Sequence, residues 1–268
     1  MASKQKSGWW GSARVPVGRR ARWRIGPLTL DVTRLEREWL VTHRSTENGH
    51  DDQVQVEPEL EPTEELEAGT QVARFGVSHD GDEIELVPVM PDRAVVTRPE
   101  HPVTVPARES ATMYVGAPLW IRIREPKKDR TLLDLPAVRP IQTFWGVDTC
   151  EGELCYATRT YGRLRLSDAR VPPHRVLTAV RIENDEATPL LIERLHLPVR
   201  VLSVYSDDQD RLWSEAVTLS RKQGEEFAEL SLEKNPGPEA ANAQRVSKAR
   251  EKAEKNELVR AFGKFFKL

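Results

Sequence analysis

The stretch QVARFGVSHDGDEIELVPV, residues 71–89, indicates the class of fold. On both sides of residues 78–82, apolar and polar side chains alternate, as they do in strands that bury one face. Asp80-Gly81 is a typical two-residue hairpin turn, so the two halves are predicted to pair with each other as a β-hairpin.

Short runs with strand character continue outward from this stretch in both directions. They cover residues 28–32, 39–41, 94–97, 103–105, 112–115, 119–123, 143–145, 154–161, 163–166, 176–182, 190–197, 212–219 and 227–232. Residues 28–32 and 39–41 are predicted to pair across a short turn, and 212–219 and 227–232 to form a hairpin. Prolines between many of them exclude helices. The sequence therefore predicts a mainly β fold over residues 26–234, either a β-sandwich or two packed β-modules that divide near residue 108.

The formal net charge of -2 conceals three charge blocks, one of them the mainly basic segment 245–268. Residues 1–24 carry basic but no acidic side chains, and residues 47–67 carry acidic but no basic ones. Such blocks are typical of solvated segments. We therefore predict a flexible basic arm over residues 1–25 and an acidic loop over residues 47–68.

The C-terminal part differs in composition from the predicted β domain. After Asn235-Pro236-Gly237-Pro238, the chain is rich in Ala, Lys, Glu and Arg, which favour helices. Residues 235–268 are therefore predicted to form a linker and a basic amphipathic helix. Its apolar stripe and flanking bases are Leu258, Phe262, Phe265, Phe266, Arg260, Lys264 and Lys267.

This stripe is the main predicted partner-binding element. We expect it to occupy a groove on another protein or an anionic membrane surface, with Trp9 and Trp10 of the basic arm as a second contact. The alternative is that the stripe packs back onto its own β domain.

The candidate chemical groups do not form a recognisable motif. Cys150 and Cys155 are separated by four residues, which does not match the usual spacing of zinc ligands, and both are expected to be reduced. His79 is expected in a turn, and His196 as a half-buried strand residue rather than a ligand. We therefore expect no enzymatic activity, no metal and no cofactor.

The seven tryptophans bear on a second class of function. Trp120, Trp145 and Trp213 lie in predicted strands, where bulky aromatic residues fill a core. Exposed tryptophans would instead favour a carbohydrate-binding module.

The remaining composition indicates a cytoplasmic protein, with membrane association through the tail. No apolar run is long enough to span a bilayer, and the N-terminus lacks the apolar core of a signal peptide. We do not expect nucleic acid as a partner, because an acidic block accompanies the N-terminal arginines.

Three segments resemble an uncharacterised prokaryotic family of unknown function, over residues 26–232. They are Ala-Pro-Leu-Trp-Ile at 117–121, Gly-Glu-Leu-Cys-Tyr-Ala-Thr-Arg-Thr-Tyr at 152–161, and Arg-Ile-Glu-Asn at 181–184. Members of that family are often encoded beside small-conductance mechanosensitive channels. The resemblance implies a non-enzymatic accessory protein that docks on another protein, such as a channel. The alternative is a ligand-binding β-sandwich, for example a carbohydrate-binding module.

Overall fold

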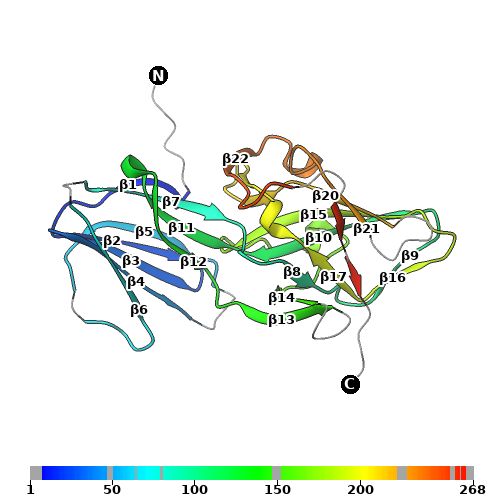
Figure 1. The fold of residues 1–268 in the computed structure, drawn as a ribbon, viewed down its shortest axis with the longest axis horizontal. Helices are drawn as coiled ribbons and strands as arrows, with labels where there is room; N and C mark the ends of the chain where they lie inside the picture. The colour runs from blue at the N-terminus through cyan, green and yellow to red at the C-terminus, as the bar shows by residue number, and fades with distance from the viewer. Residues whose placement is uncertain are drawn as a thin grey trace. The chain divides into compact units, whose positions relative to one another are not determined.

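The chain divides into two compact units. The computed structural model describes residues 8–46, 51–63, 65–78, 81–146, 152–221, 228–253, 257–259 and 261–263. Unit 1 comprises Met1–Pro88, Leu119–Arg139 and Pro172–His174, and unit 2 comprises Val89–Pro118, Pro140–Val171 and Arg175–Leu268. The expected division near residue 108 therefore falls inside unit 2, and the chain enters each unit more than once (Figure 1).

Unit 1 consists of a four-stranded and a five-stranded sheet. Their orders are β1-β7-β11-β12 and β5-β2-β3-β4-β6. The strands are β1 (Gly11–Arg14), β2 (Arg19–Ile25), β3 (Leu28–Leu35), β4 (Glu38–Ser45), β5 (Val54–Leu60), β6 (Gln71–Gly76), β7 (Glu83–Val89), β11 (Trp120–Glu125) and β12 (Arg130–Pro136), with a 3-10 turn at Pro126–Lys128.

A buried polar contact joins the two sheets of unit 1. The indole nitrogen of Trp39 on β4 donates to the carboxylate of Glu125 on β11 at 2.9 Å. Both sheets also contribute fully buried apolar side chains, including Leu30, Ile84 and Ile121. Burial of this kind is the main stabilising term of a sandwich core.

The pairing of β3 with β4 was predicted correctly, and that of the stretch 71–89 was not. Residues 28–45 form an antiparallel hairpin in which Leu28 lies opposite Ser45. In contrast, β6 pairs with β4, and β7 lies between β1 and β11 in the other sheet. The alternating pattern identified both strands but not their partners. It shows that one face of a strand is buried, but not which other strand pairs with it in the sheet.

The predicted basic arm and acidic loop are both corrected by the structure. Strands β1 and β2 lie within residues 1–25, and β5 lies within residues 47–68. β2 pairs with β5, so that Arg22 lies directly opposite Glu57. The two blocks therefore form neighbouring strands, because opposite charges across a strand pair stabilise it.

Unit 2 is also built of strands. They are β8 (Val95–Thr97), β9 (Val103–Val105), β10 (Ser110–Pro118), β13 (Ile141–Gly146), β14 (Gly152–Ala157), β15 (Arg175–Asn184), β16 (Leu190–Ile192), β17 (Arg194–Leu197), β18 (Val204–Ser206), β19 (Leu212–Ser214), β20 (Val217–Arg221), β21 (Ala228–Leu232), β22 (Gln244–Ser247), β23 (Glu257–Val259) and β24 (Phe262–Gly263).

These strands make three sheets. An eight-stranded sheet has the order β22-β18-β19-β15-β20-β21-β23, with β10 pairing to β15, and a five-stranded sheet has the order β13-β14-β8-β17-β24. A two-stranded sheet joins β16 and β9. The predicted strand at 163–166 is replaced by an isolated bridge between Arg163 and Tyr114 and a 3-10 turn at Leu166–Asp168.

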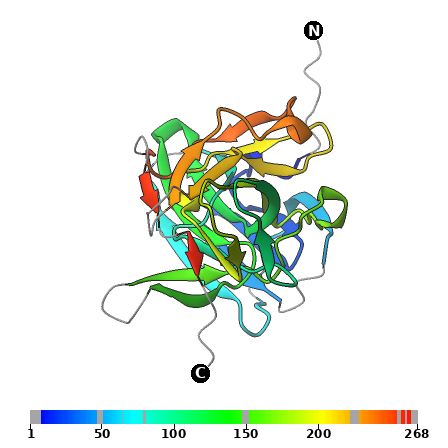
Figure 2. The same cartoon turned by 90° about the vertical axis from the view of Figure 1, so that its right-hand side faces the viewer.

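The C-terminal helix was a wrong prediction. In its place the structure has a 3-10 turn at Pro238–Ala240 and the strands β22, β23 and β24, which pair with β18, β21 and β17. In Figure 2 the C-terminal strands, in red, lie beside other strands of unit 2. Helix propensities differ by only tenths of a kcal/mol per residue, and strand pairing outweighs them here. Among the described residues, no helix has the length and apolar character needed to cross a membrane.

Candidate functional site

One face of the five-stranded sheet in unit 2 gathers the candidate chemical groups. On β14, Glu153 lies opposite Trp145 and Cys155 lies opposite Thr143, both on β13. On the other side of β14, Ala157 pairs with Val96 of β8, and Val96 pairs with His196 of β17. Directly paired residues point to the same side of a sheet, so all of these side chains share one face, the site face.

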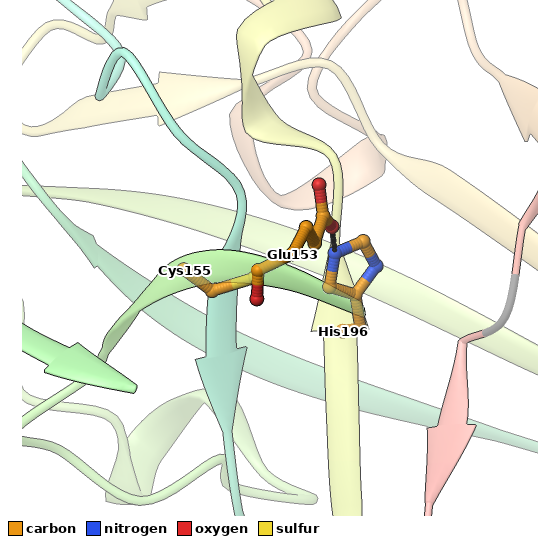
Figure 3. Close-up of side chains that lie close together, drawn as sticks. All are labelled: Glu153, Cys155 and His196. Carbon is orange, nitrogen blue, oxygen red and sulfur yellow. Dashed lines mark hydrogen bonds and ion pairs between the residues drawn. The ribbon is translucent and has the colours of Figure 1, made fainter. Parts of the chain in front are cut away.

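Three side chains of the site face come together across β8. Glu153, Cys155 and His196 each offer a ligand atom, and these atoms lie within 4.8 Å of one another. Nε2 of His196 hydrogen-bonds to the carboxylate of Glu153, and the Cys155 thiol donates to the Glu153 carbonyl oxygen at 3.7 Å. Figure 3 shows Glu153 and Cys155 on one strand and His196 on another, with the imidazole turned toward the carboxylate.

The trio is held by its neighbours. The ring of Trp145 stacks on that of His196, with centroids 5.4 Å apart and an interplanar angle of 23°. The guanidinium of Arg194 lies 5.1 Å from the centre of the Trp145 ring. The backbone of His196 donates to the carbonyl of Ala261, the residue before β24, so the C-terminal segment helps to position this histidine.

Burial and hydrogen bonding shift the pKa values of Cys155 and Glu153. Burial raises the pKa of the fully buried Cys155 thiol to about 12, assisted by the nearby Glu153 carboxylate. The hydrogen bond with His196 lowers the pKa of Glu153. At neutral pH, Cys155 is thus a protonated thiol and a poor nucleophile, while Glu153 is a carboxylate.

A groove of about 700 Å³ lies on the same sheet. Its lining residues are Val96, Thr97, Arg98, Ile141, Thr143, Phe144, Ala157, Thr158, Arg159, Thr160, Tyr161 and Arg194. Among the described residues, the lining contains three arginines and no acidic side chain. The groove is therefore electropositive and suited to an anionic ligand.

Aromatic and apolar groups accompany the arginines of the groove. The guanidinium of Arg98 lies 5.4 Å from the centre of the Tyr161 ring, and Tyr161 is itself exposed. Ile141 and Phe144 are exposed as well, at 48% and 38%. The groove can therefore contact apolar and anionic groups of one ligand.

The predicted partner-binding residues are distributed differently from the expectation. Leu258 lies on β23, and Phe262 lies half-buried on β24 opposite Leu195, an arrangement that corresponds to the alternative in which the tail packs on its own domain. In unit 1, Trp9 is buried and Trp10 half-buried, with ring centroids 5.5 Å apart. Outside the described residues lie Arg260, Lys264, Phe265, Phe266, Lys267, Cys150 and His79.

Sequence reasoning missed the trio. It placed Cys155 with Cys150 and regarded His196 as a structural residue. Glu153 and His196 are 43 positions apart, on strands separated by β8. The available signal was the spacing Glu-x-Cys within a strand, which puts both side chains on one face.

The tryptophans do not form the exposed platform that would favour a carbohydrate module. All seven lie within the described residues; six are buried and Trp10 is half-buried. Trp120, Trp145 and Trp213 are 4%, 8% and 0% exposed, as expected for residues of a core.

Comparisons with known proteins place the chain in a family. Neither the curated proteins nor the solved structures contained a match. A family model described as a protein of unknown function, DUF432, matches residues 9–267, nearly the whole sequence. This confirms the resemblance to an uncharacterised family, and the match extends beyond residues 26–232 at both ends. The chain belongs to the DUF432 family.

Proposed function

We propose that this protein is a non-catalytic binding protein that docks an acidic, extended segment of a partner protein in the groove of unit 2. The observation that carries the proposal is the lining of the groove, which includes Arg98, Arg159 and Arg194 and, among the described residues, no acidic one. Carboxylates of the partner would pair with guanidinium groups, which are suited to bidentate hydrogen bonds.

The apolar rim supports a peptide rather than a small inorganic anion. Ile141 and Phe144 expose substantial apolar surface beside the arginines. Covering such surface contributes roughly 25 cal/mol per Å² before the costs of association. A segment that alternates acidic and apolar side chains would use both features of the groove.

The identity of the partner is part of the proposal. The sequence resemblance implies a small-conductance mechanosensitive channel, and an acidic segment of such a channel is the partner that we propose. In this arrangement the described part of the C-terminal tail is not the docking element, since β23 and β24 pair within unit 2.

A peptide-binding experiment tests the groove directly. The probe is a fluorescent peptide of alternating glutamate and valine, and its anisotropy is measured with the full chain. Arg98→Glu should weaken binding at least about tenfold, which corresponds to about 1.4 kcal/mol. The reason is that the variant places a negative charge where the carboxylates of the peptide would bind. Added salt should weaken it further.

Matched controls separate the groove from general charge. Arg165→Glu makes the same charge change at an exposed arginine of unit 2 that does not line the groove, and should bind like the unmodified chain. A peptide of alternating lysine and valine should not bind. Equal loss in both variants, or equal binding of both peptides, would refute the groove proposal.

Co-purification from the native host tests the partner. The unmodified chain and the Arg165→Glu variant should retain the channel, and the Arg98→Glu variant should lose it. Retention by the Arg98→Glu variant would contradict docking through the groove. If vesicles with anionic phospholipid bind the chain while the acidic peptide does not, the site serves a membrane and the proposal is wrong.

A further inference from the structure

We propose that Glu153, Cys155 and His196 form a binding site for a divalent metal ion of the zinc class. This inference is independent of peptide docking, because it rests on the trio and not on the arginines of the groove. The three residues supply one oxygen, one sulfur and one nitrogen ligand from β14 and β17.

The spacing of the ligand atoms suits zinc after a small adjustment. Zinc lies about 2.0–2.3 Å from such ligands, so ligand atoms in a tetrahedral site are roughly 3.5 Å apart. The three atoms here lie within 4.8 Å of one another. The side chain of Glu153 is 52% exposed and can rotate toward the other two, which are buried.

The donor set selects the class of metal. Calcium and magnesium prefer oxygen ligands, whereas a thiolate combined with imidazole suits zinc and the neighbouring transition metals. Three protein ligands leave a fourth position for water or another donor, as in zinc sites that exchange a ligand.

The histidine is preorganised for this role. Its side chain is 8% exposed, Trp145 stacks on the ring, and Nε2 points toward Glu153 (Figure 3). Within the described part of the chain, the buried Nδ1 has no hydrogen-bond partner, and it can carry the ring proton. When Nε2 is engaged by a metal, the neutral imidazole carries its proton on Nδ1.

Metal binding has a defined proton balance. The S–H bond of Cys155 breaks, the thiolate sulfur bonds to the metal, and one proton passes to the buffer. His196 binds the metal through Nε2 and carries its ring proton on Nδ1. The thiol proton of Cys155 should therefore be released for each metal bound.

Cobalt substitution tests the site on the full chain. Co²⁺ added to the protein should bind once per chain and produce a thiolate-to-cobalt charge-transfer absorption, which Zn²⁺ then abolishes by displacement. Cys155→Ser should remove this absorption, and His196→Gln should weaken Zn²⁺ binding at least about tenfold, measured by competition with a chromophoric chelator.

The controls use the other thiol and an exposed histidine. Cys150→Ser and His101→Gln should both keep the cobalt absorption and the zinc affinity. Glu153→Gln alters a half-exposed side chain and should fold normally, as far-ultraviolet circular dichroism can verify, while binding zinc more weakly. The proposal is overturned if cobalt gives no thiolate absorption, or if Glu153→Gln and His196→Gln bind zinc like the unmodified chain.

The two proposals fail separately. Loss of metal binding in Glu153→Gln with unchanged peptide binding supports the metal site alone. Loss of peptide binding in Arg98→Glu with unchanged cobalt absorption supports the groove alone.

Discussion

The arginines of unit 1 and those of the groove in unit 2 have different partners. In unit 1, Arg22 on β2 lies directly opposite Asp31 on β3 and donates two hydrogen bonds to it, at 2.8 and 2.9 Å. Arg122 and Asp134 make the same kind of pair between β11 and β12. In unit 2, Arg98 lies over the ring of Tyr161, and Arg194 lies over the ring of Trp145 and donates to the carbonyl of Phe144 at 3.2 Å.

The difference in partners distinguishes arginines that stabilise the fold from arginines that can bind a ligand. A carboxylate cancels the charge of the guanidinium and ties two strands together. An aromatic ring holds the guanidinium by its quadrupole and leaves the net charge in place. The ring contacts of unit 2 therefore position arginines that keep an electropositive groove.

The largest expected effect is the loss of a buried carboxylate in unit 1. Asp31→Ala should lower the free energy of unfolding by about 3 kcal/mol, because Arg22 and Arg20 would lose the carboxylate that accompanies their burial. Urea denaturation followed by tryptophan fluorescence measures this loss.

Asp134→Ala is the matched control for this change. The side chains of Arg122 and Asp134 are 28% and 25% exposed, so water screens their pair and the loss should be about 1 kcal/mol. Equal losses in the two variants would show that the partners of the arginines, rather than their burial, set the energy.

A smaller effect is expected at the aromatic partner in unit 2. Tyr161→Leu removes the ring that contacts both Arg98 and Arg163, and should cost about 1 kcal/mol in thermal denaturation. Tyr161→Phe keeps a ring and should cost less. Acidic-peptide binding should survive in Tyr161→Phe and weaken in Tyr161→Leu, where the guanidinium of Arg98 loses its support. Identical behaviour of the two variants would mean that the ring does not position Arg98.

The smallest effect concerns pH and an exposed pair of unit 1. The hydrogen bonds from Arg74 lower the pKa of Glu38 below its usual value of 4.5. The pair therefore contributes stability above pH 4.5, and this contribution disappears as the pH falls through the lowered pKa. The Glu38→Gln variant lacks this contribution. The free energies of unfolding of the variant and of the unmodified chain, plotted against pH, should therefore converge in acid. High salt should also bring the curves together at neutral pH. Curves that stay parallel down to pH 2 would contradict a role for this carboxylate.

Much of the strand content was predictable, because alternation is a local property. Residues 28–45 and 217–232 contain hairpins whose two strands are neighbours in the chain, and both pairings were predicted. Residues 71–89 show the limit, since β6 and β7 are close in sequence but belong to different sheets. Pairing of β6 with β7 was predicted wrongly, because the strand that lies beside another in a sheet can come from a distant part of the sequence.

The candidate site was less predictable than the fold. The sequence shows Glu153 and Cys155 on one face of a strand, but not that β8 and β17 continue that face to His196. The arginines of the groove come from three separate strands or their ends, so no local cluster of basic residues marks them. Parallel pairing of β14 with β8 requires a long connection, and such contacts leave little local pattern.

By itself, the sequence determined that this chain would form many short strands, because side chains of successive strand residues point to opposite faces and the alternation is written locally. Only the tertiary structure decided which strands pair and where the charge blocks meet. The arm at β2 is ordered by the acidic strand β5, and the Lys- and Glu-rich tail becomes strands beside β18, β21 and β17. The physical reason is that hydrogen bonding and burial along a sheet edge exceed small intrinsic propensities, and they depend on partners far away in the chain.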